Sequence, residues 1–266
     1  MKLATQDKPF FPKDFKDKLQ AIGRMGFDAF EIDGKILVDH FDEVKRATEL
    51  TGIPIAASCG GYRGWIGDFD RDHRMMAISD ITVILERLSM VSGRGIVVPA
   101  AWGMFSKRLP PMEAPRSEEE DTAVLLESLR QLDEAAGRTG TIIFLEPLNR
   151  YEDHMVNKLE DAYALLRAGS FANVKIVADF YHMNIEEQHI DISLRQAGEA
   201  IGHVHLADSN RYEPGQGHLD FTPGFKALKD NHYEGYMTFE CRVLGVPEEE
   251  AYRASVRYIQ HLWESA

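Results

Sequence analysis

Eight short apolar segments, each followed by a stretch in which apolar residues recur at helical spacing, are the feature that most constrains the fold of this chain. Segments such as IPIAAS, GIVVPA, TIIFLE and VKIVAD are too short for helices. They are apolar at nearly every position, as parallel strands buried on both faces are. The predicted strands are Lys2–Thr5, Phe27–Asp33, Ile53–Ser58, Gly95–Ala100, Thr141–Glu146, Val174–Asp179, Ile201–Ala207 and Tyr236–Cys241.

The segments between these strands carry apolar residues three and four positions apart, as amphipathic helices do. Two such series are Ile78, Ile81, Leu85, Leu88 and Val124, Leu125, Leu129, Leu132. Strand followed by helix, eight times in 266 residues, predicts an α/β protein with a single (β/α)8 TIM barrel domain over residues 1–266. An open doubly wound sheet is the alternative. No GxGxxG or GxxxxGK[ST] motif follows a predicted strand, which weakens the nucleotide-binding forms of that alternative.

The composition limits the partners and the location of the protein. A formal charge of −13 at pH 7, without a run of Lys or Arg, disfavours nucleic acid because phosphate groups would be repelled. No apolar stretch is long enough to span a membrane, and the first residues are too polar for a signal peptide. We therefore expect no membrane association and a cytoplasmic location. Cys59 and Cys241 are expected to be free thiols in a reducing compartment.

Acidic and imidazole side chains stand at the ends of the last four predicted strands. They are Glu146, Asp179, His205 and Glu240. Each alone could be a helix cap or an ion-pair partner. Inward-facing side chains at the carboxyl ends of barrel strands converge, however, and the active sites of such barrels are built there. Three carboxylates and one imidazole suit Mn²⁺, Mg²⁺ or Co²⁺ better than a structural zinc, so we predict a divalent-metal site with Mn²⁺ as the favoured ion.

Three polar residues lie a few positions beyond the predicted ligands, in the loops above them. They are Glu152, His182 and Arg211. Such side chains can bind the hydroxyl and carbonyl oxygens of a sugar, and Arg211 offers a fixed fork of donors. Being cationic, Arg211 should stay clear of a divalent ion. Two long connections that follow strand ends, 102–115 and 208–221, are candidate lids or walls of the same pocket.

Several neighbouring residues have weaker assignments. His203 lies two positions before His205 and shares its face one layer deeper, as a partner of the ligands or as a packed histidine. Cys241 should point outward into the helix layer. Asn149 and Arg150 are expected to brace the loop after the fifth strand. Aromatic residues that could form an apolar wall against a sugar are Trp65, Trp102, Tyr62 and Phe105.

Four motifs in the second half of the chain resemble the xylose-isomerase-like barrel superfamily: EPLNRYE, DFYH, HVHLADSNR with the following PGQGHLDF, and FEC. Within it, the pattern is most similar to ketose 3-epimerases of the D-tagatose 3-epimerase type. The resemblance implies that the four predicted ligands bind the metal and that Glu146 and Glu240 also act as the acid/base pair. It further implies that Glu152, His182 and Arg211 hold the substrate's first carbons, and that the protein is a homodimer or homotetramer.

The predicted site suits the removal and return of a sugar proton. A metal that binds the carbonyl and neighbouring hydroxyl oxygens of a ketose acidifies the adjacent C–H and stabilises the resulting enediolate. Two carboxylates on opposite faces of this planar intermediate can remove a proton from one side and return one to the other, which inverts the carbon. The sequence therefore predicts a metal-dependent sugar isomerase or epimerase.

Other functions are compatible with the same barrel. An inosose isomerase or dehydratase, or a hydroxypyruvate-isomerase-like enzyme, could use the same intermediate. An endonuclease IV-like DNA repair enzyme needs more metal ligands on early strands, whereas strands two to four are expected to end in Asp33, Ser58 and Ala100. A non-catalytic sugar-binding barrel is the last alternative, because fold alone does not specify function.

Overall fold

The structure, a computed structural model, describes residues 1–105 and 113–266. Its strands form a closed barrel in which each strand pairs in parallel with the next and β8 pairs with β1. The strands are β1 Lys2–Thr5, β2 Ala29–Ile32, β3 Ile55–Cys59, β4 Gly95–Pro99, β5 Ile142–Glu146, β6 Val174–Asp179, β7 Ile201–Leu206 and β8 Tyr236–Phe239. The predicted (β/α)8 barrel is confirmed, and the alternative of an open sheet is wrong.

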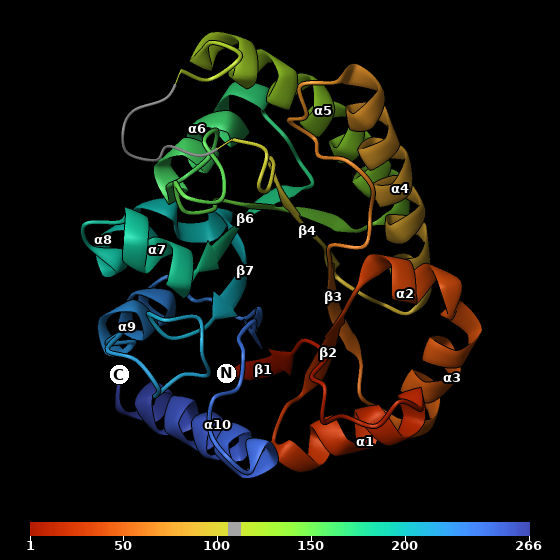
Figure 1. Ribbon diagram of the computed structural model, residues 1–266, viewed down its shortest axis with the longest axis vertical. Helices are drawn as coiled ribbons and strands as arrows, with labels where there is room; N and C mark the ends of the chain where they lie inside the picture. Colours follow the sequence, from red (N-terminus) through yellow and green to blue (C-terminus); the bar gives the residue numbers. More distant parts are fainter. Residues whose placement is uncertain (106–112) are drawn as a thin grey trace.

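Helices cover the outside of the barrel, and Figure 1 looks into the ring of strands that they enclose. They are α1 Phe15–Met25, α2 Gly34–Asp39, α3 Phe41–Thr51, α4 Arg71–Met90, α5 Glu118–Thr139, α6 Leu159–Gly169, α7 Phe180–Glu186, α8 Ile190–Ala197, α9 Thr222–Asp230 and α10 Glu248–Ser265. The connections after β2 and β6 each hold two of these helices. No helix within the described residues is long and apolar enough to cross a membrane.

Alternation along the strands separates two apolar regions. Outward-facing residues such as Ile143 and Leu145 of β5 pack against the helices in the main core. The predicted helical series around Ile81 and Leu129 lie in α4 and α5 and join this core. Inward-facing residues form a separate small cluster inside the barrel, made of Ala57, Val97, Phe144 and Val177.

The inner face of the barrel changes from apolar to polar toward the carboxyl ends of the strands. On β5, Phe144 is followed two residues later by Glu146, and on β6, Val177 is followed by Asp179. Because side chains alternate between faces, residues two apart stay on the inner side. A buried polar layer therefore lies directly above the apolar plug of the barrel.

The predicted strand limits agree with the structure to within two residues, and the differences have local causes. β2 ends at Ile32, because Asp33 accepts a hydrogen bond from the backbone N–H of Ile36 and caps α2. An Asp just before a helix is favoured as a cap since it satisfies a free backbone donor. β3 continues one residue past Ser58, and β4 stops one residue before Ala100. The expected strand end at Asp33 is therefore corrected to a helix cap.

Candidate metal centre and active site

Four side chains from neighbouring strands come together at the carboxyl end of the barrel. They are the predicted ligands Glu146 on β5, Asp179 on β6, His205 on β7 and Glu240 directly after β8. One carboxylate oxygen or ring nitrogen from each lies within 4.8 Å of those of the other three. Nδ1 of His205 is 3.0 Å from Oε1 of Glu146 and 2.9 Å from Oε2 of Glu240. Successive strands of the closed barrel thus produce this convergence.

Asp179 contacts both the helix that follows it and the cluster, because β6 ends where α7 begins. Its Oδ1 accepts hydrogen bonds from the backbone N–H groups of Tyr181 and His182, at 2.7 and 3.1 Å. These bonds satisfy donors of the first helical turn and fix the carboxylate. Its Oδ2 faces the cluster, 3.8 Å from Nδ1 of His205. The helix-cap role of a strand-end Asp is therefore compatible here with a role in the site.

The acids of the cluster have unequal proton affinities. Burial and the adjacent Glu240 raise the pKa of Glu146 to about 7. Burial also opposes ionisation of Glu240, but Arg211 and His205 outweigh it and hold the pKa of Glu240 well below its ordinary value. Burial likewise opposes the charge of His205, yet the carboxylates around the ring raise its pKa well above the ordinary value. The two neighbouring carboxylates, Glu146 and Glu240, therefore differ in their affinity for a proton.

The chemistry of the donor set fits a hard divalent cation. Glu146 and Asp179 are buried, His205 is fully buried, and Glu240 keeps 17% of its side chain exposed. Carboxylates held this close repel one another, and a divalent ion among them would turn that repulsion into attraction. Oxygen ligands with one imidazole suit Mn²⁺, Mg²⁺ or Co²⁺. These four residues are therefore a candidate site for one such ion.

Arg211 reaches into the cluster from the loop after β7. Its guanidinium donates to Oδ2 of Asp179 at 2.9 Å and to Oε2 of Glu240 at 2.6 Å. It also lies 4.6 Å from the centre of the Tyr181 ring. Its backbone is left-handed, with φ of 64°, which is unfavourable for a non-glycine residue. Arg211 thus pairs with two of the candidate ligands, because they are buried negative charges within its reach.

The loop that carries Arg211 is organised by Asp208. The carboxylate of Asp208 accepts hydrogen bonds from the backbone N–H groups of Ser209, Gly215 and Leu219, at 2.8, 2.8 and 3.0 Å. Burial opposes the charge of Asp208, but these donors outweigh it and hold its pKa below the ordinary value. One ionised side chain thus joins the two ends of the loop and supports the left-handed turn at Arg211.

Asn149 connects the other two predicted substrate residues. Its Nδ2 donates to Oε1 of Glu152 at 2.9 Å and to Nδ1 of His182 at 2.8 Å, and its backbone N–H donates to the same Nδ1. Because Nδ1 of His182 accepts, the ring proton stays on Nε2, which lies 3.8 Å from Oδ2 of Asp179. Burial lowers the pKa of His182 and favours this neutral form. The indole N–H of Trp102 donates to the second oxygen of Glu152 at 2.9 Å.

Arg150 and Cys241, which had weaker predictions from the sequence, lie near the candidate site. Arg150 ties the loop after β5 to α7 through two bonds from its guanidinium to Glu186, at 2.9 and 2.8 Å. This is the bracing contact expected of it. Cys241 packs against the main core beside Tyr252, and burial raises the pKa of its thiol to about 11. Cys241 is free, as is Cys59.

A cavity of about 680 Å³ opens above the cluster. Its walls include Gln6, Trp102, Tyr181, Arg211, Tyr212 and Glu240. The connection 208–221 forms part of these walls, whereas residues 106–112 of the connection 102–115 lie outside the described residues. Of the four aromatic residues considered for a sugar wall, Trp102 lines this cavity. Trp65 packs between Trp102 and Tyr62, and Phe105 lies against His154.

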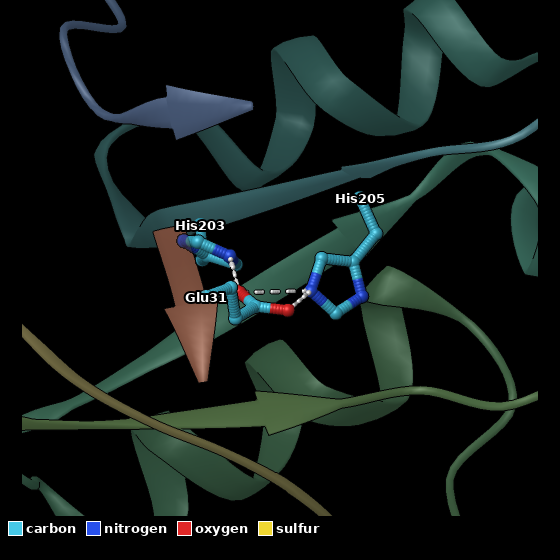
Figure 2. Close-up of side chains that lie close together, drawn as sticks. All are labelled: Glu31, His203 and His205. Atoms are coloured by element: carbon cyan, nitrogen blue, oxygen red, sulfur yellow. Dashed lines mark hydrogen bonds and ion pairs between the residues drawn. The ribbon is translucent and has the colours of Figure 1, made fainter. Parts of the chain in front are cut away.

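Glu31 in β2 is a buried acid that was not predicted as part of the site. Figure 2 shows its carboxylate between the rings of His203 and His205, with Oε2 2.7 Å from Nε2 of His203 and Oε1 3.1 Å from Nε2 of His205. His203 is therefore a partner in the polar layer, and it also stacks on Phe144 with ring centres 5.1 Å apart. A signal for Glu31 was present in the sequence, because a charged residue inside the otherwise apolar strand AFEI needs a buried partner.

A model of the xylose isomerase-like TIM barrel family matches residues 19–262. The chain belongs to this family. Within it, the chain is 48% identical over 260 residues to the 3-dehydro-D-guloside 4-epimerase of Escherichia coli strain K12, covering 98% of this chain and 99% of that protein. The apo crystal structure of a 3-keto-D-glucoside 4-epimerase from E. coli has a TM-score of 0.96 at 48% identity, again over 98% and 99% of the two chains.

Relatives of lower identity are also named as epimerases. A D-psicose 3-epimerase of Enterocloster bolteae is 27% identical over 238 residues, covering 87% of this chain and 78% of that protein. These relatives are carbohydrate epimerases, so the chain is a carbohydrate isomerase or epimerase. The resemblance to ketose 3-epimerases inferred from the motifs is thereby confirmed at the level of the family.

Proposed function

We propose that this protein is a divalent-metal-dependent epimerase that inverts a sugar carbon next to a ketone. The observation that carries the proposal is the pair of largely buried carboxylates, Glu146 and Glu240, that share the imidazole of His205 at 3.0 and 2.9 Å. Together with Asp179, these residues are the proposed metal ligands. The epimerase activity of the family members supports the same class of reaction.

Glu146 and Glu240 are the proposed acid/base pair. The ion, when bound, would polarise the ketone and so acidify the neighbouring C–H. One carboxylate removes the proton from that carbon, and the other returns a proton to the opposite face, which inverts the configuration. Inversion needs one group that holds a proton and one that does not. Both carboxylates contact Nδ1 of His205, at 3.0 and 2.9 Å, which supports their acting on the same substrate carbon.

Glu152, His182 and Arg211 are the proposed contacts of the sugar oxygens next to the reacting carbon. His182 can donate through Nε2, because its Nδ1 is occupied by Asn149. Arg211 donates through a planar fork, and Glu152 accepts from sugar hydroxyls. Two of these side chains, Glu152 and Arg211, line the cavity above the cluster. They would thus hold the substrate with its reacting carbon toward the acids.

The proposed substrate is a glycoside that carries a ketone at C3 and is inverted at C4. The E. coli relatives named for reactions on 3-dehydro-D-guloside and 3-keto-D-glucoside match almost the full length of this chain at 48% identity. The cavity of about 680 Å³ is large enough for a ligand bigger than one sugar ring. A free ketose inverted at C3 is the second candidate, supported by the D-psicose 3-epimerase relative.

A substrate panel separates the two candidates. The EDTA-treated protein, reloaded with Mn²⁺, is incubated with 3-keto glycosides, free ketoses and inososes, and the products are identified by NMR. We expect inversion at C4 of a 3-keto glycoside with kcat/KM at least tenfold above that for any free ketose. Faster turnover of a free ketose would instead identify the protein as a ketose 3-epimerase. Dehydration of an inosose would identify it as an inosose dehydratase.

The proposal also covers the metal ion, the domain organisation, the location and the oligomeric state of the protein. We infer that Mn²⁺ is the working ion, which the mixed oxygen and nitrogen ligand set supports. Residues 1–266 act as one domain, since β1 and β8, at the two ends of the chain, pair with each other. The protein works in the cytoplasm, which its two free thiols support. It acts as a symmetric homodimer or homotetramer, the usual forms of soluble oligomers.

A further inference from the structure

The carboxylate of Glu31 is fully buried and accepts from several directions. Its Oε1 accepts from Nε2 of Gln6 at 2.9 Å and from Nε2 of His205 at 3.1 Å. Its Oε2 accepts from Nε2 of His203 at 2.7 Å and from the hydroxyl of Thr238 at 3.3 Å. The side chains of Glu31 and His205 are both 0% exposed. An isolated charge would be too costly at this depth, so the four donors are what keep the carboxylate in place.

The contact with Glu31 determines which edge of His205 faces the acids. An ionised carboxylate can only accept, so Nε2 of His205 carries a proton wherever it bonds to Glu31. The opposite nitrogen, Nδ1, is then the one that points at Glu146 and Glu240. Figure 2 shows the ring held in this orientation, with one edge against Glu31. A ring flipped by half a turn would lose this bond and would place a carbon where Nδ1 now stands.

We propose that Glu31 is a positioning residue for metal binding, which orients His205 so that the lone pair of Nδ1 is presented to the ion. This inference rests on the proposed function, because it takes His205 as a ligand. Metal-binding histidines commonly donate their second N–H to a carboxylate, which fixes the ring and strengthens the ligand. Glu31 supplies that carboxylate from β2, on the other side of β8 and β1 in the barrel.

Glu31 also has an indirect connection to the acid/base pair. Nε2 of Gln6 donates to Oε1 of Glu31 at 2.9 Å and lies 3.1 Å from Oε1 of Glu240. The side-chain amide of Gln6 thus contacts both Glu31, which lies behind His205, and Glu240, which lies in front of it. A shift of Glu31 would therefore move two of the four candidate ligands, His205 and Glu240, and not only one.

A second metal site is the competing explanation of the same residues. Glu31, His203 and His205 offer three ligand atoms within 4.8 Å of one another. The contacts of 2.7 and 3.1 Å between Glu31 and the two rings are hydrogen-bond lengths, and Gln6 and Thr238 occupy the remaining acceptor sites of the carboxylate. An ion there would have to displace these donors in a region closed to solvent. The geometry therefore favours a positioning role.

The test measures Mn²⁺ binding to the EDTA-treated protein by isothermal titration calorimetry. The wild type should bind one ion per chain, and Glu31→Gln should raise the Kd by ten- to a hundredfold, the usual effect of losing such a partner. Thr238→Val is the matched control, because it removes only the donor with the longest bond to Glu31, at 3.3 Å, and leaves the other three donors, His205 among them, in place. Its Kd should change less than threefold. Circular dichroism and Tm establish that each variant is folded, and Glu31→Asp replaces Glu31→Gln if the latter does not fold.

A spectroscopic readout separates orientation of the ring from general stability. In the Co²⁺-loaded wild type, the Nε2–H of His205 should give a paramagnetically shifted NMR signal that exchanges slowly with D2O. In the Glu31 variant this signal should exchange faster or disappear. An unchanged Kd and an unchanged signal in a folded Glu31 variant would overturn the positioning role. Two ions in the wild type and one in the variant would overturn it in favour of a second metal site. If the wild type binds no divalent ion, the proposed function itself fails.

Discussion

The two edges of the His205 ring face different carboxylates. Nδ1 lies 2.9 and 3.0 Å from Glu240 and Glu146, and Nε2 lies 3.1 Å from Glu31. The first pair belongs to the proposed reaction centre, whereas Glu31 lies behind the ring, on the side away from them. Substitutions at Glu240, Arg211 and Glu31 should therefore affect proton transfer, substrate binding and metal binding separately.

Glu240→Gln should abolish turnover and leave the fold intact. The amide has nearly the same volume, but it can neither take up a proton nor bind a metal as a carboxylate does. We expect kcat to fall by roughly a hundred- to ten-thousandfold, the usual range for losing a general base. The assay is run at saturating Mn²⁺, with the circular dichroism spectrum as the control for folding. Activity close to that of the wild type would show that Glu240 is not the base.

Arg211→Ala should weaken the use of substrate and spare the metal. A charged hydrogen bond to the sugar contributes about 1.5 to 3 kcal/mol, so kcat/KM should fall roughly ten- to a hundredfold. Metal content should be unchanged or higher, since the guanidinium pairs with the candidate ligands Asp179 and Glu240. Arg195→Ala, which removes a surface pair with Asp230, is the matched control. Loss of metal with normal kinetics after reloading would make Arg211 a brace of its loop.

How far the sequence predicts the site depends on whether a residue acts within its own strand or across the barrel. Glu146 and Asp179 could be recognised because a strand end and the parity of its side chains determine where they point. Glu31 is marked by its charge inside an apolar strand, but its role could not be recognised, because its partner His205 lies 174 positions along the chain, across two intervening strands.

At the scale of elements, strands were predicted more accurately than the details of the helices. The eight strands follow from apolar runs whose burial on both faces leaves little freedom. The start of α2 is set instead by capping at Asp33, and α2 is divided from α3 at His40, which makes no side-chain cap bond. Such boundaries depend on single hydrogen bonds worth about 1 kcal/mol, which periodicity does not resolve.

Asp153, in the loop between β5 and α6, should make the stability of the folded protein depend on pH. Asp153→Asn should remove that contribution. Burial raises the pKa of Asp153 to about 7, although backbone N–H groups of residues 154–156 donate to it. Between its unfolded value near 4 and about 7, the folded state holds more protons than the unfolded state. Stability from this group therefore falls as pH rises through that window, by up to about 1.4 kcal/mol per pH unit.

The measurement compares Tm from pH 4 to pH 8 for the wild type, Asp153→Asn and the surface control Asp230→Asn. The Tm of the Asp153 variant should rise relative to the wild type between pH 4 and 7 and stay parallel above pH 7. The Asp230 variant should run parallel to the wild type throughout. Parallel curves for the Asp153 variant as well would show that this carboxylate is ionised in the folded protein across the whole range.

At the scale of the whole molecule, we expect self-association. Sedimentation velocity at micromolar concentration should show a species of twice or four times the 30.1 kDa chain mass. Dilution of the wild-type protein is the control, because mass action should shift the distribution of species toward the monomer. A single 30 kDa species at all concentrations would contradict this expectation.

The central claim is that the cluster at the carboxyl end of the barrel inverts a carbon by moving its proton with the help of a divalent ion. The direct test is turnover of a 3-keto glycoside in D2O, followed by NMR at the inverted carbon. The Mn²⁺-loaded protein should yield product with deuterium at that carbon, and the EDTA-treated protein should yield none until Mn²⁺ is restored. Inverted product that keeps the original hydrogen, or equal turnover without the ion, would contradict the account.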